Sequence, residues 1–157
     1  MLRMKMVKEV FQNDLSDFIL IEKVDFNEKD QLAKTMFDAY KYSPDYENDT
    51  VDDFKMEIDN LKEGLYGDII EDACLCIRYQ GQIVSAIFLC DFRGEATVTY
   101  CCTQRAYQGG GLAEALIKKA ENELYKKGYK EFYTYLTLTN KDAFALFDSL
   151  GFSEIEI

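Results

Sequence analysis

The chain has 157 residues, 48% of them apolar and only one of them proline, which predicts a single globular domain over residues 1–157. The net charge of −11 argues against a nucleic-acid partner, because binding to phosphates requires a basic surface. It is compatible with a cationic partner, which a negative field concentrates, although plain solubility is the more common reason for such a charge. No run of about 20 apolar residues occurs, so we expect no membrane partner.

The N-terminus and the cysteines favour a cytoplasmic protein. Residues 1–7 alternate methionine with basic residues and lack the apolar run of a secretory signal. The five cysteines lie in apolar, strand-like runs, and the chain has no histidine. Their spacing matches no zinc site, so we expect reduced, buried thiols and no metal.

The front half of the chain predicts one strand and two helices. Residues 17–24 form a short apolar run typical of a strand, and apolar residues at helical spacing predict a helix over 26–41. An aromatic and acidic loop follows. Thr50, with Asp53 three residues later, resembles a capping box that opens a second helix, which we expect to end near Gly64 or Gly67.

The rear half begins with an apolar period of two, which predicts strands over 73–79, 83–92 and 96–103. Tight turns at Gln80-Gly81 and Arg93-Gly94 join them. A glycine-rich loop then leads into a helix over 112–128. A strand over 131–138, a short helix over 140–150 and a final strand over 153–157 complete the chain. This order predicts an α/β (α+β) fold with an antiparallel front half and a parallel crossover at the rear.

The most informative segment is Gln108–Ala113 (QGGGLA), which joins a predicted strand to a predicted helix. Three glycines leave backbone N–H groups free to point at one anion, and the helix N-terminus adds partial positive charge. The segment therefore predicts a phosphate-bearing ligand. A dinucleotide site would need its glycines after the first strand, and a P-loop would need Gly-Lys-Ser/Thr; neither pattern is present.

Two motifs in this order resemble the GNAT (Gcn5-related N-acetyltransferase) superfamily. Its pyrophosphate loop, R/Q-x-x-G-x-G/A, is matched by Gln108, Gly111 and Ala113. Its second block, N-x-x-A-x-x-x-Y/F-x-x-x-G-F, is matched by Asn140, Ala143, Phe147 and Gly151-Phe152. The match is tight over residues 96–157 and rests on element order before them. The resemblance implies a mixed central sheet of six or seven strands flanked by about four helices.

The resemblance also implies acetyl-CoA as cosubstrate. The strand before the glycine loop should pair with the pantetheine arm through its backbone, and the N–H groups of the loop should hold the pyrophosphate. The implied contacts are Cys101, Cys102, Thr103, Gln108, Gly109, Gly110, Gly111, Leu112, Ala113, Glu114 and Asn140. Asn140 is equally suited to cap the last helix, and both roles stay open.

Acetyl transfer to an amine needs a deprotonated nitrogen, an oxyanion donor and a proton source for the thiolate. Many family members place a tyrosine acid where this chain has Phe147, so the resemblance leaves the acid open. The glutamate base of ribosomal-protein N-terminal acetyltransferases aligns with Tyr135. That of histone acetyltransferases falls on Thr97, and Glu95, two residues earlier, would share the face of Thr97 if the strand extends that far. Glu95 and Tyr135 are thus the catalytic candidates. Tyr100 and Tyr133 are further candidates, because a tyrosine hydroxyl can polarise the carbonyl or relay a proton. Plain strand packing is the alternative for all four.

The loop over residues 42–53 is where the family usually places its acceptor. Tyr42 and Tyr46, among five carboxylates, are candidate contacts for an ammonium group through charge and cation–π interaction; a solvated acidic loop is the alternative. We predict an acetyl-CoA-dependent N-acetyltransferase acting on a primary amine of a small molecule or peptide, as a monomer or homodimer. The alternative function is a non-catalytic acyl-CoA-binding module, which Phe147 favours.

Overall fold

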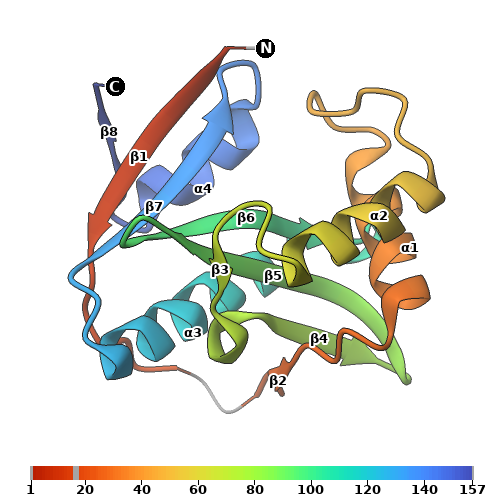
Figure 1. The fold of residues 1–157 in the computed structure, drawn as a ribbon, viewed down its shortest axis with the longest axis horizontal. Helices are drawn as coiled ribbons and strands as arrows, with labels where there is room; N and C mark the ends of the chain where they lie inside the picture. Colours follow the sequence, from red (N-terminus) through yellow and green to blue (C-terminus); the bar gives the residue numbers. More distant parts are fainter. Residues whose placement is uncertain (1, 16–17, 157) are drawn as a thin grey trace.

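A computed structural model describes residues 2–15 and 18–156. Its strands form one mixed sheet in the order β2-β4-β5-β6-β7-β1-β8, with β3 paired to β5 (Figure 1). The strands are β1 (Arg3–Glu9), β2 (Glu22–Lys23), β3 (Asp68–Ile69), β4 (Leu75–Tyr79), β5 (Gln82–Phe92), β6 (Glu95–Thr103), β7 (Glu131–Thr137) and β8 (Ser153–Ile155). The helices are α1 (Lys29–Tyr40), α2 (Val51–Lys62), α3 (Leu112–Lys127) and α4 (Lys141–Ser149). The predicted mixed α/β fold is confirmed, with one or two more strands than expected.

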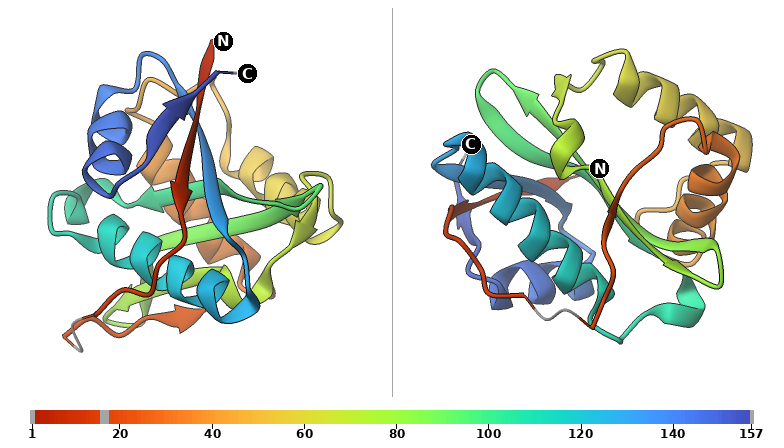
Figure 2. Two further views of the ribbon diagram at one scale, coloured as in Figure 1. Left: turned by 90° about the vertical axis from the view of Figure 1, so that its left-hand side faces the viewer. Right: turned by 90° about the horizontal axis from the view of Figure 1, so that it is seen from below.

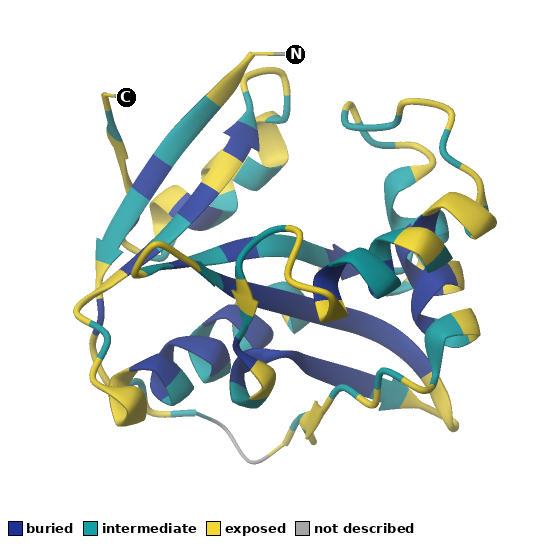
Figure 3. Ribbon diagram, in the orientation of Figure 1, coloured by how far each residue is buried: buried dark blue, intermediate teal, exposed yellow. Residues whose placement is uncertain are grey.

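Two apolar clusters form on opposite faces of the sheet, and β5 serves both. Ile87 and Leu89 pack in the cluster that contains α3, whereas Phe88 and Cys90 pack in the cluster that contains α1 and α2. Period-two alternation in a strand buried on both faces produces this division. Figure 2 shows the helices on either side of the sheet, and Figure 3 shows the nearly continuous burial of β5.

The predicted first strand is wrong in position. Of the predicted range 17–24, only β2 is a strand, and residue 17 lies outside the described residues. The first strand of the chain is instead β1, where methionine and basic residues alternate. It pairs antiparallel with both β7 and β8, and its Lys5 lies opposite Tyr135 on one side and Ile155 on the other. The period of two was present in the sequence, but its partners lie more than a hundred residues away.

The local signals of the remaining elements are confirmed. Thr50 Oγ1 accepts the Asp53 N–H at 3.1 Å, and Asp53 Oδ2 accepts the Thr50 N–H at 2.7 Å, which completes the capping box of α2. The turn before β5 has positive φ angles of 50° and 78° at its two central residues, and the turn before β6 has 55° and 88°. These are the values of type I′ hairpins, whose twist matches that of the strands.

Within residues 2–15 and 18–156, no helix has the length and apolarity required to span a membrane.

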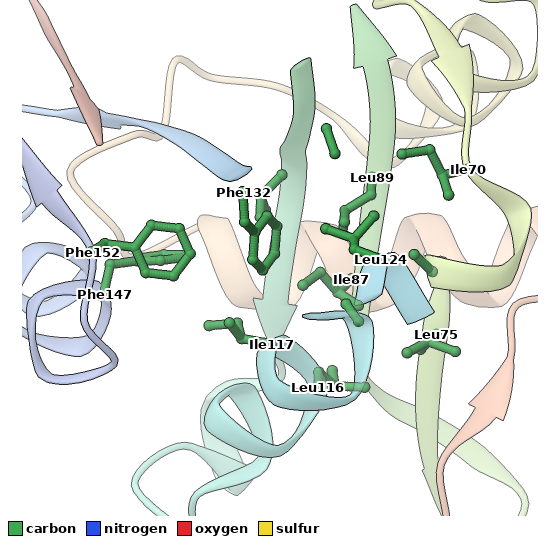
Figure 4. Close-up of a cluster of buried hydrophobic side chains, with 14 of the residues drawn as sticks. Ile70, Leu75, Ile87, Leu89, Leu116, Ile117, Leu124, Phe132, Phe147 and Phe152 are labelled. Atoms are coloured by element: carbon green, nitrogen blue, oxygen red, sulfur yellow. The ribbon is translucent and has the colours of Figure 1, made fainter. Parts of the chain in front are cut away.

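An aromatic group fastens α4 to the sheet. The ring of Phe152 lies 5.2 Å from that of Phe132 on β7 and 5.1 Å from that of Phe147 on α4, edge to face (Figure 4). The Phe152 N–H donates to Phe147 O at 3.0 Å and the Gly151 N–H donates to Asp148 O at 3.1 Å. These two bonds, with φ of 98° at Gly151, form the Schellman end that places Phe152 in the core.

We expect Phe152→Ala to lower the free energy of unfolding by about 3–5 kcal/mol, because the ring is buried and its loss leaves a cavity. The matched control is Phe144→Ala on α4, where the ring is 39% exposed and the expected loss is at most about 1 kcal/mol. Urea unfolding followed by circular dichroism measures both. Equal losses would contradict the assignment of Phe152 to the core that fastens α4.

Candidate active site

The parallel strands β6 and β7 part after a short paired stretch. Ala96–Val98 pair with Phe132–Thr134, and no pairing of the two strands continues past that point in the described chain. β7 goes on along β1, whereas β6 continues along β5 to Thr103 (Figure 1). The backbone of β6 beyond Val98 therefore has an open edge inside the sheet, where a ligand can add as a strand.

The hydrogen-bond phase of β6 identifies which residues face this edge. The Gln104 N–H donates to Val84 O on β5 at 2.8 Å. Backbone groups of a strand point to alternate sides, so those of Cys102, two residues earlier, also point toward β5. Cys101 and Thr103, which alternate with these residues along the strand, direct their backbone groups toward the open edge. Tyr40 Oη donates to Cys101 O at 3.1 Å, and Gln108 Nε2 donates to Thr103 O at 3.0 Å.

A β-bulge at Thr99 turns the side chain of Tyr100. Leu89 lies opposite Val98, but the preceding residue of β5, Phe88, lies opposite Tyr100. Val98 packs in the α3 cluster, and Tyr100 packs against the cluster of α1 and α2. Both would lie on one face of a regular strand. The bulge thus points Tyr100 toward α2, as bulges beside active sites often re-aim a side chain.

A cleft of about 940 Å³ opens between the diverging strands, α2 and the loop before it. Among its described lining residues, Arg3 is the only lysine or arginine. Six carboxylates line it: Asp45, Glu47, Asp49, Asp53, Glu57 and Glu95. A cleft of this charge attracts ammonium groups. The described residues contain no cluster of side chains arranged to hold a metal ion.

Glu57 on α2 is the centre of a hydrogen-bonded group in the cleft. Its Oε2 accepts the hydroxyls of Tyr66 at 2.5 Å and Tyr100 at 2.7 Å, and its Oε1 accepts Asn60 Nδ2 at 2.9 Å. Burial, and then the bond to Glu57, raises the pKa of Tyr66 to about 12 and that of Tyr100 well above its usual range. Sequence reasoning missed Glu57 and Tyr66; the position of Glu57 beside the apolar stripe of α2 was the available signal.

The two predicted catalytic residues both line the cleft. Glu95 accepts Lys5 Nζ through both oxygens, at 2.9 and 3.0 Å, and this bond raises the pKa of Lys5. Lys5 Nζ lies 5.7 Å from the ring centre of Tyr135 and 4.8 Å from that of Tyr133. Tyr133 is not among the lining residues, and its hydroxyl donates to Glu131.

The predicted cap at Asn140 is confirmed. Asn140 Oδ1 accepts the Ala143 N–H at 3.1 Å at the start of α4. Its Nδ2 donates to Asp45 Oδ2 at 2.9 Å, which ties the acidic loop to α4 across the cleft. The other oxygen, Asp45 Oδ1, is buried without a hydrogen-bond partner in the described part of the chain. A buried carboxylate oxygen in that state is a ready acceptor for a ligand N–H.

Tyr42 and Tyr46 do not line the cleft. The ring of Tyr42 lies 4.1 Å from the guanidinium of Arg105 and 5.5 Å from Lys41 Nζ, so cations of the protein itself already occupy its faces. The Tyr46 N–H donates to Ser43 O at 3.2 Å within the loop. The loop presents polar side chains to the cleft instead: Asp45, Glu47, Asn48 and Asp49.

The glycine loop leaves the first turn of α3 open. Gly111 is the N-cap, with φ of 84° and no side-chain cap, and the first helical bond runs from the Ala115 N–H to Gly111 O. The N–H groups of residues 112–114 precede that bond and point out of the helix end. A Cβ on Gly109 or Gly111 would meet no protein atom within 4 Å, so the positive φ, and not packing, requires glycine there.

Two lining residues do not supply a proton. Phe147, at the usual tyrosine position, has no hydroxyl and is buried edge-on against Phe152. Burial raises the pKa of the Cys101 thiol to about 12, so it stays neutral. The five cysteines are free thiols, and the prediction of burial is confirmed for all except Cys101, which is half-buried.

The sheet, the parted strands and the glycine-capped helix are features of acetyltransferases. The chain belongs to the Acetyltransferase (GNAT) family, whose model matches residues 34–152. It is similar to the [Ribosomal protein bS18]-alanine N-acetyltransferase of Escherichia coli strain K12, at 36% identity over 63 residues. That alignment spans 40% of this chain and 43% of the relative, so the chain matches less than half the length of this curated protein.

Solved structures share the fold. A GCN5-related N-acetyltransferase from Sphaerobacter thermophilus superposes with a TM-score of 0.73 at 14% identity, over 98% of this chain and 48% of that one. The PaiA N-acetyltransferase from Thermoplasma acidophilum, in complex with coenzyme A, superposes with a TM-score of 0.70 at 18% identity, over 88% of this chain and 91% of its own.

We expect Glu57→Gln to lower the pKa of Tyr66 from about 12, because the substitution removes the charge and the strong acceptor that hold its proton. NMR of ring-labelled tyrosines during a pH titration measures this shift. Tyr129 is an internal control, since its pKa, also about 12, depends on burial and on Asp91 and should not move. An unmoved Tyr66 would show that Glu57 does not hold this hydroxyl in solution.

Proposed function

We propose that residues 1–157 form one domain that acts as an acetyl-CoA-dependent N-acetyltransferase on a primary amine of a small molecule or peptide. The observation that carries the proposal is the parting of β6 and β7 beside the open N-terminus of α3. One part offers an unpaired strand edge and the other a set of free N–H groups. An acyl thioester on a pantetheine–pyrophosphate arm requires both.

The proposed cosubstrate site follows the chain from strand to helix. The backbone edge at Cys101 and Thr103, with Cys102 between them, would take the pantetheine amides. The loop and first turn would hold the pyrophosphate through Gln108, Gly109, Gly110, Gly111, Leu112, Ala113 and Glu114. The Thermoplasma protein of the same fold was solved in complex with coenzyme A, which supports the choice of cosubstrate. Asn140, which caps α4 and holds Asp45, would support the acceptor side of the cleft.

The proposed acceptor site is the acidic wall of the cleft. The six lining carboxylates attract an ammonium group, and the buried Asp45 Oδ1 offers it an unsatisfied acceptor. In the reaction, the deprotonated amine attacks the thioester carbonyl, the C–S bond breaks, and the thiolate takes a proton. Glu95 and Tyr135 border the cleft, but Phe147 contributes only its shape.

We expect Gly111→Ala to weaken acetyl-CoA binding at least tenfold, about 1.4 kcal/mol, because the new methyl group strains the loop and enters the proposed phosphate site. The matched control is Gly128→Ala at the other end of α3. Its φ of 86° and open surroundings are nearly identical, so both variants should lose similar stability. Calorimetry with acetyl-CoA measures binding. Equal binding by the two variants would contradict a phosphate site at Gly111.

We expect release of CoA thiol when acetyl-CoA is mixed with a suitable amine from a panel of spermidine, an aminoglycoside, amino acids and peptides with free N-termini. Thiol detection gives the rate, and mass spectrometry of the amine gives the product. Tight acetyl-CoA binding with no transfer to any of these amines would favour the acyl-CoA-binding module. No binding at all would overturn both functions.

A further inference from the structure

Glu57 and Tyr100 form a pair that the cosubstrate site does not use. Tyr100 lies two residues past the point where β6 leaves β7, directly before the strand segment proposed to hold the pantetheine arm. Its ring packs edge-on against Tyr40, at 5.9 Å, and its hydroxyl points to Glu57 on α2. Both residues line the cleft. A hydroxyl held between a reacting centre and a carboxylate can pass a proton from one to the other.

Resting on the proposed function, we propose that Tyr100 and Glu57 are the proton relay that deprotonates the acceptor amine. The ammonium nitrogen gives a proton to Tyr100 Oη as Tyr100 gives its own proton to Glu57 Oε2. Tyr100 is neutral before and after the step, and Glu57 changes from carboxylate to carboxylic acid. The neutral amine then forms the C–N bond as the C–S bond breaks. The second proton of the nitrogen passes to the thiolate, which leaves as CoA thiol.

The environment of Tyr100 suits a relay and not an anionic base. Burial and the bond to Glu57 raise its pKa, so the tyrosinate form is disfavoured while transfer through the hydroxyl is not. The other tyrosine packed against it, Tyr40, already donates its hydroxyl to Cys101 O. Tyr66 donates to the same oxygen of Glu57 and acts as a positioning residue that fixes the carboxylate.

Glu57 is better placed than Glu95 to receive the proton. Both oxygens of Glu95 bind Lys5 Nζ, so protonating Glu95 would leave an ammonium group unpaired in a half-buried position. Within the described chain, Glu57 accepts hydrogen bonds from neutral groups: two tyrosine hydroxyls and the amide of Asn60. Two further charged groups act on the tyrosines bonded to Glu57: Arg3 from β1 acts on Tyr66, and Asp49 from the loop acts on Tyr100.

The test compares Glu57→Gln and Tyr100→Phe with matched controls outside the cleft. Glu63→Gln makes the same change at the exposed C-terminal end of α2, and Tyr125→Phe makes it where α3 exposes its tyrosine. Spermidine, or the panel amine acetylated fastest, is the protonated acceptor. Hydroxylamine, largely unprotonated at neutral pH, is an acceptor that needs no base. Calorimetry with acetyl-CoA checks that each variant still binds the cosubstrate.

We expect kcat/KM with the protonated acceptor to fall about 100-fold or more at neutral pH in both cleft variants. Activity should recover as pH rises toward about 10, where solvent deprotonates amines unaided. Turnover of hydroxylamine, and both control variants, should match the wild-type protein. The two cleft variants remove one and the same pathway, so either one tests it if the other fails to fold.

A wild-type rate and pH profile in either cleft variant would overturn the relay and leave the proposed function intact. An equal loss with hydroxylamine would show a structural role and would also overturn it. Wild-type protein that acetylates no amine would overturn the relay together with the proposed function.

Discussion

The early parting of β6 and β7 is the constraint on which the rest of the site depends. A strand edge inside a sheet leaves backbone groups that must find partners, and such groups are costly when buried and unpaired. Here Tyr40 and Gln108 supply partners to the carbonyls of Cys101 and Thr103. The remaining edge faces a polar cleft instead of a packed core. The sheet therefore contains a binding edge because pairing stops after Val98, and not because a loop was added to it.

The two walls of the cleft are held by different sets of contacts. β7 is fixed by β1 and by the aromatic cluster of Phe132, Phe147 and Phe152, whereas β6 is fixed by β5 and by helices α1 and α2. The cluster beneath α3 reaches both strands and joins them where they still pair. Phe147 thus contributes to the shape of one wall. Its burial edge-on against Phe152 suits a side chain that has no hydroxyl.

The sequence predicts the parts of the structure that depend on neighbours along the chain. The capping box at Thr50, the cap at Asn140 and the Schellman end at Gly151 involve residues within five positions of each other. The group around Glu57 draws on α2, the segment after it and β6, and Tyr100 joins it only because a bulge at Thr99 turns its side chain. A one-residue bulge has no clear mark in the sequence, so this part of the site was not predictable.

Strand β1, which the sequence did not predict, also changes the interpretation of Glu95, which the sequence did predict as a catalytic candidate. Glu95 stands out in the sequence as an acidic residue at the start of a strand beside the cleft. Its partner Lys5 comes from β1, which reaches the cleft only because it pairs with β7. The ion pair ties Glu95 to a cation and leaves Glu57, whose hydrogen-bond donors are neutral, as the carboxylate proposed to receive the proton. The placement of one strand therefore favours Glu57 over Glu95 as the proposed base.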